Sequence, residues 1–204
     1  MDEKKYQGII KKTGTDYSID LLSIGGSAVP WIGGPMGVIL SNISSERKYK
    51  RIYDVLAGVI SDLNGFKSEA SEQYVKTDEF EELAEKTLKK VAEERNSEKR
   101  DLFRKFLIKA IKFPSIDYNE QMRFIRILEE IQIDQLKILK ILFEENHGAQ
   151  LPSLLHRLPD MTREQVRDLI MHLNSLCITE ISTKDGSIAV TEFGRRFVEY
   201  IICQ

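Results

Sequence analysis

The side chains with the most obvious capacity for chemistry are three histidines and two cysteines, and their spacing matches no catalytic or metal-binding pattern. Cys177 and Cys203 form no CxxC pair, and none of the histidines belongs to an HExxH sequence. The glycines between positions 25 and 37 are not followed by the lysine of a phosphate-binding loop, and Gly25-Gly26-Ser27 lacks the second glycine of a nucleophile elbow. We therefore expect no catalytic residue, no metal, no cofactor and no enzymatic activity.

A binding surface is predicted between residues 163 and 184, where basic and polar side chains occupy the outward positions of a helix and a turn. Such side chains could contact bases or phosphates, although Glu164 and Asp168 on the same helix would repel phosphates. The candidate residues for nucleic-acid or partner binding are Arg163, Arg167, His172, Asn174 and Lys184.

The charge balance disfavours DNA as the partner. The whole chain has 30 Lys+Arg against 32 Asp+Glu, a formal net charge of −2. Residues 134–204 alone contain eight Lys+Arg and ten Asp+Glu, whereas a DNA-binding domain is typically clearly basic. We expect an unidentified protein to be the partner of this region.

An uncharged segment covers residues 21–45 and contains five glycines and two prolines. It is longer than the 18 or so residues that suggest a transmembrane helix, but Gly33-Gly34-Pro35 breaks any helix at its midpoint. Each half would reach only about 15–18 Å as a helix, against a hydrocarbon core of about 30 Å. Two interpretations stay open: the segment packs against the rest of the protein, or it contacts a membrane as a re-entrant hairpin or interfacial patch.

Basic residues flank this segment on both sides, so both of its ends would stay on the cytoplasmic side of a membrane. No signal peptide precedes it, and we expect a cytoplasmic protein that, in the second interpretation, is peripheral at the inner face of the cytoplasmic membrane. The candidate membrane-contact residues are Trp31, Arg47, Lys48, Lys50 and Arg51.

The elements that position these residues are predicted to be mainly α-helical. A polar arm (1–20) and the uncharged segment (21–45) precede a helical bundle (46–132), in which apolar residues recur every three or four positions. Thr77 and Asn96 are expected to cap two of its helices, and Pro114 to end one. A homodimer through the first long helix is compatible with this pattern.

The order of elements changes in residues 133–204. Two helices are followed by a third that Thr162 and Gln165 should begin with a capping box. Two short β-type runs joined by Lys184-Asp185-Gly186-Ser187 then predict a hairpin, and a last helix starts at Thr191. This order predicts a C-terminal winged helix-turn-helix with a small β-hairpin.

Two regions resemble the bacterial Abi-alpha family over about residues 45–200. One comprises residues 97–107, 125–131 and 134–139; the other comprises residues 173–176 and 191–198, with the distinctive ending Thr-x-x-Gly-Arg-x-Phe. The resemblance implies a role in abortive infection, in which an infected cell halts growth and so stops phage spread. It implies no catalytic residues.

Together these observations predict a non-enzymatic phage-defence protein. Its winged helix or bundle would act as a sensor or interaction module, and its uncharged segment as a membrane-contacting element. The alternative is a soluble winged-helix binding module, either a transcriptional regulator or a protein–protein adaptor.

Overall fold

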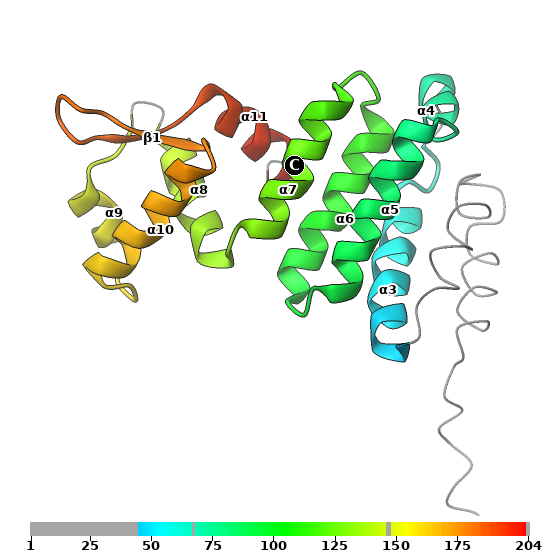
Figure 1. The fold of residues 1–204 in the computed structure, drawn as a ribbon, viewed down its shortest axis with the longest axis horizontal. Coiled ribbons are helices and arrows are strands. Elements are labelled where there is room, and N and C mark those ends of the chain that lie inside the picture. The colour runs from blue at the N-terminus through cyan, green and yellow to red at the C-terminus, as the bar shows by residue number, and fades with distance from the viewer. Residues whose placement is uncertain (1–44, 67, 146–147, 203–204) are drawn as a thin grey trace, which may run out of the picture. The chain divides into compact units, whose positions relative to one another are not determined.

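The structure, a computed structural model, describes residues 45–66, 68–145 and 148–202, which form nine helices and one two-stranded sheet (Figure 1). The prediction of a mainly helical protein with a small hairpin is confirmed. The chain divides into an N-terminal unit that ends at Tyr118 and a C-terminal unit that begins at Asn119. Residues 132 and 133, where we predicted a boundary from the sequence, lie where one helix gives way to the next, which begins at Ile133.

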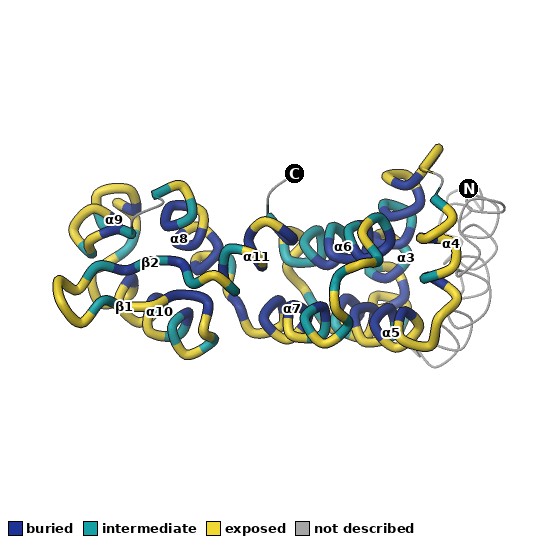
Figure 2. Tube along the Cα trace, turned by 90° about the horizontal axis from the view of Figure 1, so that it is seen from above, coloured by how far each residue is buried: buried dark blue, intermediate teal, exposed yellow. Residues whose placement is uncertain are grey.

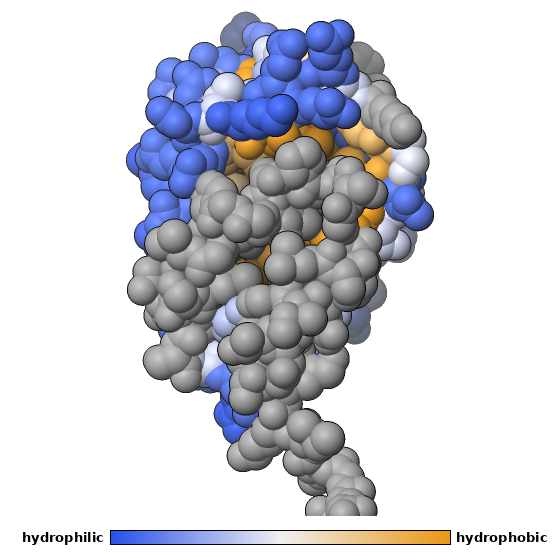
Figure 3. Space-filling model, turned by 90° about the vertical axis from the view of Figure 1, so that its right-hand side faces the viewer, coloured by the Kyte–Doolittle hydropathy of each residue, from blue (hydrophilic) through white to orange (hydrophobic). Residues whose placement is uncertain are grey.

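The N-terminal unit is a helical bundle in which α3, α5 and α6 pack against one another. Figure 2 shows buried and exposed residues alternating along α5 and α6, as expected for amphipathic helices. On the side of this unit that Figure 3 presents, apolar side chains are visible beneath a border of hydrophilic ones. The helices are α3 (Glu46–Asp62), α4 (Glu69–Tyr74), α5 (Asp78–Glu93) and α6 (Ser97–Lys112).

Local capping explains where two of these helices begin. The Thr77 side chain accepts a hydrogen bond from the Phe80 amide at 3.3 Å, and the Asn96 side chain accepts from the Glu98 amide at 2.8 Å. Both predicted caps are confirmed. The short helix α4 was not predicted, because its six residues contain no repeating apolar pattern and its only sequence signal is the capping Ser68.

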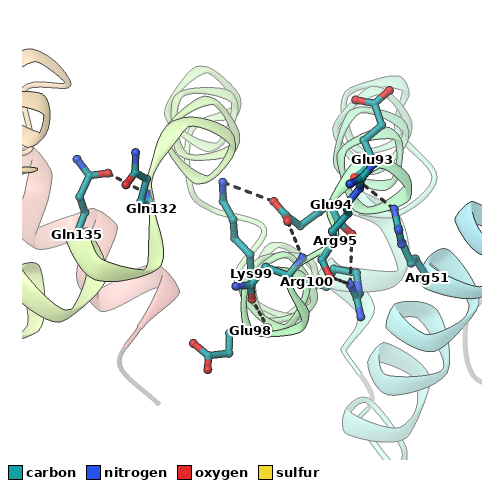
Figure 4. Close-up of polar contacts among 10 residues, drawn as sticks. Arg51, Glu93, Glu94, Arg95, Glu98, Lys99, Arg100, Gln132 and Gln135 are labelled. Carbon is teal, nitrogen blue, oxygen red and sulfur yellow. Dashed lines mark hydrogen bonds and ion pairs between the residues drawn. The ribbon is translucent and has the colours of Figure 1, made fainter.

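Two arginines stabilise the connection between α5 and α6 (Figure 4). Arg51 of α3 donates to the carbonyl oxygens of Ala92 and Glu93 at 2.9 and 3.3 Å. Arg100 of α6 donates to the carbonyl of Arg95 at 2.8 Å. Because the last carbonyls of a helix have no partner within it, the Arg51 guanidinium completes the end of α5, and the Arg100 guanidinium holds the connection that follows.

The C-terminal unit combines five helices with the hairpin. Its helices are α7 (Tyr118–Glu130), α8 (Ile133–Glu144), α9 (Leu151–Arg157), α10 (Arg163–Ser175) and α11 (Glu192–Ile201), and its strands are β1 (Thr179–Ile181) and β2 (Ile188–Val190). Phe124 of α7 lies against Phe197 and Tyr200 of α11, with ring centroids 5.6 and 5.2 Å apart. This aromatic cluster fixes α11 on α7.

The predicted hairpin is confirmed. Strands β1 and β2 are antiparallel, with Thr179 opposite Val190 and Ile181 opposite Ile188. Gly186 supplies the positive φ of 70° that the turn needs. On its other edge β2 is bridged by Ala149, so that a residue between α8 and α9 acts as a rudimentary third strand.

The Thr-x-x-Gly ending identified in the sequence joins α11 to the hairpin. Thr191 caps α11 by accepting from the Gly194 amide at 2.9 Å, and its hydroxyl also lies 2.8 Å from the Cys177 carbonyl. The Thr191 amide donates to the carbonyl of Ile178 at 2.9 Å. Gly194 packs so tightly on Ile178 that a Cβ there would overlap this same carbonyl oxygen. The distinctive motif is therefore explained by packing.

Candidate partner-binding site

Helix α10 begins with the predicted capping box, which is confirmed. The Gln165 side chain accepts from the Thr162 amide at 2.8 Å, and the Thr162 hydroxyl accepts from the Gln165 amide at 3.3 Å. Val166, Ile170 and Leu173 are buried against the unit. The opposite side of the helix is left facing outward.

The structure separates the five predicted binding residues into two groups. Arg163 and Arg167 are exposed on α10, and Lys184 is exposed in the hairpin turn. His172 and Asn174 are half-buried. Only the three cations are therefore fully available to a partner.

The outward side of α10, which we call the α10 face, mixes both signs of charge with an apolar group. Glu164 and Asp168, each of which directly follows one of the two arginines in the sequence, are also exposed. Met171 follows on the same side, and 52% of its surface is exposed. Sequence analysis did not single out Met171, although its spacing of four residues from Arg167 places it on the same side of the helix.

The hairpin turn also mixes charges. Asp185 Oδ1 accepts from the amide and the hydroxyl of Ser187 at 3.1 and 2.9 Å. Hydrogen bonds from the side chains of Ser182 and Ser187 and from the backbone lower the pKa of Asp185. The aspartate is thus held ionised beside Lys184, which weakens the attraction of this turn for phosphate.

A buried glutamine holds α10 against α8. The side-chain oxygen of Gln135 accepts from the Gln132 amide at 2.8 Å, a bond that fixes the orientation of the amide group (Figure 4). Its nitrogen therefore points to α10, where it donates to the Leu169 carbonyl at 3.1 Å and lies 2.7 Å from His172 Nδ1. With an amide N–H directed at it, Nδ1 acts as the acceptor in this contact. His172 thus helps to position α10.

Beside this contact lies an open cleft of about 620 Å³ between the start of α8 and α10. Its lining is Gln132, Asp134, Gln135, Lys137, Asp160, Met161, Gln165, Asp168, Leu169 and His172. Lys137 is paired with Asp134 at 2.7 Å. Sequence analysis missed this cleft, because residues 135 and 172 meet only through folding. In the part of the chain that the structure describes, no three His, Cys, Asp or Glu side chains are grouped so that they could hold a metal ion.

The predicted membrane-contact residues occupy different environments. Arg47, Lys48 and Lys50 are exposed at the start of α3, and Lys50 is paired with Asp54 at 3.0 Å. Arg51 is half-buried and bonded to the end of α5, as described above. Trp31, like most of the uncharged segment, lies outside the described residues. No helix between residues 45 and 202 is both long and apolar enough to cross a membrane, residues 67, 146 and 147 not being described. Lipid contact stays a prediction.

Comparisons with known proteins add no assignment. The chain matches no family model, no curated protein and no solved structure.

Proposed function

We propose that this chain is a non-enzymatic binding protein whose C-terminal unit is a winged helix that docks a protein partner through the α10 face. The order α8, α9, α10, β1, β2 is that of a winged helix-turn-helix. The pairing of Ala149 with Ile188, through reciprocal hydrogen bonds of 2.8 and 2.9 Å, supports this assignment. It provides the extra strand between the first two helices.

The observation that carries the choice of a protein partner is the half-exposed Met171 among charges of both signs. A thioether has nothing to gain from a phosphate backbone, whereas methionine and arginine are enriched in protein interfaces. Glu164 and Asp168 would oppose phosphates at the position where a DNA-reading helix approaches them. A protein partner that presents a small apolar side chain and charges of both signs would be complementary to this face.

A titration with random-sequence duplex DNA tests the proposal against DNA binding. The full chain is compared with the double variant Arg163→Glu/Arg167→Glu and with Arg126→Glu, which changes an exposed arginine of α7. We expect no saturable binding by any of them at physiological salt. Tight binding by the wild type and by Arg126→Glu, falling steeply with salt and lost in the double variant, would identify a DNA-binding winged helix instead.

We propose abortive infection as the biological setting of this binding activity. The resemblance in residues 45–200 supports this role, in which the winged helix would sense a phage-derived or host protein. Expression of the chain during phage challenge tests it. Growth arrest that requires intact Arg163, Arg167 and Met171 is expected, and unchanged phage yield with and without the chain would contradict it.

A further inference from the structure

Helix α3 carries two apolar stripes. The inner stripe consists of Ile52, Val55 and Val59, all buried. The second, which we call the outer stripe, recurs at spacings of four, three and four residues, and consists of Tyr49, Tyr53, Leu56 and Ile60. Three of its members are buried and Tyr53 is half-buried. A helix that packs on one side only needs a single stripe.

The contacts of α3 with α5 and α6 through Arg51 and Gly58 lie opposite to Tyr49 and Ile60, the two ends of the outer stripe. Arg51 reaches the last carbonyls of α5, and a Cβ at Gly58, two turns later on the same side, would lie 2.5 Å from Arg104 Cδ of α6. Tyr49 is nine residues from Gly58, which at about 100° per residue places it half a turn around the helix. Ile60, two residues after Gly58, is rotated almost as far from Gly58 around the helix. The described helices that pack most extensively on α3 therefore contact it away from Tyr49, Tyr53 and Ile60, and this part of the outer stripe is left to another occupant.

The chain itself supplies a matching occupant. Residues 21–44 contain no charged residue and lead directly into α3 through Ser45. The outer stripe is about 17 Å long, since its ends are eleven residues apart, so 24 residues suffice to cover it. A covalently attached segment also has a high effective concentration at its site, which neither a second copy nor a vesicle has. We infer that residues 21–44 dock on the outer stripe of α3.

Trp31 makes this inference directly testable, because it is the only tryptophan and belongs to the segment. The emission of the full chain and its quenching by acrylamide are measured in buffer and with vesicles that contain phosphatidylglycerol. Docking predicts blue-shifted, protected emission in buffer. An exposed Trp31 in buffer overturns the inference, and protection that appears only with vesicles assigns the segment to the membrane instead.

Variants of α3 show whether the outer stripe is the docking site. In Tyr53→Asp the stripe gains a charge and loses a ring, which should weaken docking about tenfold or more and expose Trp31. Ser61→Asp introduces the same charge on the exposed side of α3 and should leave Trp31 protected. Circular dichroism verifies that both variants stay helical, and Ile60→Ala replaces Tyr53→Asp if that variant does not fold. Equal quenching of Trp31 in wild type, Tyr53→Asp and Ile60→Ala contradicts the inference.

Discussion

Substitution of Gly194 by alanine should destabilise the C-terminal unit strongly. The added Cβ would overlap the carbonyl oxygen of Ile178 and would lie 2.8 Å from Val190 Cγ1. The Ile178 carbonyl already accepts a hydrogen bond from the Thr191 amide. It therefore cannot move away from the new Cβ without breaking the contact between α11 and the hairpin.

The magnitude follows from the opposing contributions. Overpacking lowers the free energy of unfolding by about 1–3 kcal/mol. Because the group that the new Cβ meets is a backbone carbonyl and not a side chain, the loss at this site should be at the upper end of that range. Replacing glycine in a helix recovers at most about 1 kcal/mol. The free energy of unfolding should therefore fall by about 2 kcal/mol, which for a unit of this size lowers Tm by about 8–16 °C.

Gly58→Ala is the matched control, since it makes the same chemical change in α3. Its Cβ would meet only the side chain of Arg104, which is flexible and can swing away. The helix-propensity gain should then dominate, so that stability changes by no more than about 1 kcal/mol. Urea and thermal unfolding followed by circular dichroism compare the two variants. Equal losses, or a stable Gly194→Ala variant, would refute the packing argument for the Thr-x-x-Gly motif.

Three further predictions concern single residues. Thr191→Val should cost about 1–2 kcal/mol of unfolding free energy in urea, because the hydroxyl bonds are lost, while Thr191→Ser should keep most of the stability. Burial, followed by a hydrogen bond to Glu82, raises the pKa of Tyr118 to about 12, so a spectroscopic titration should show one late tyrosine that Tyr118→Phe removes. Because the unfolded chain releases this proton near pH 10 and the folded chain keeps it, stability should fall as pH rises from about 10 to 12, and less so in Tyr118→Phe. Cys177, exposed and at a φ of 59°, should tolerate asparagine with a gain of up to about 1 kcal/mol, whereas a lower Tm for Cys177→Asn would show that its side chain is needed.

The parts of the fold that sequence analysis predicted depend on local interactions. Thr77 and Thr162 bond to amides three residues away, and the turn at Gly186 requires only its own φ, so each is visible in a few neighbouring letters. The contact of Gln135 with His172 spans 37 residues, and nothing in the sequence near either residue indicates it.

The candidate site shows the same limit. The two arginines of α10 could be placed outward from periodicity alone. The outward position of Met171 follows from the same spacing, but the extent of its exposure depends on how α10 packs against α8, α9 and β1, which periodicity does not show.

Site-directed photo-crosslinking from position 171 tests the central claim most directly. A photoreactive phenylalanine replaces Met171 in one version of the chain and His156, exposed on α9, in the matched control, and both are irradiated in the native cells. We predict a discrete protein adduct from position 171, absent from position 156 and lost when Arg163→Glu and Arg167→Glu are added. A nucleic-acid adduct from position 171, or the same adducts from both positions, would contradict a protein-docking role for the α10 face.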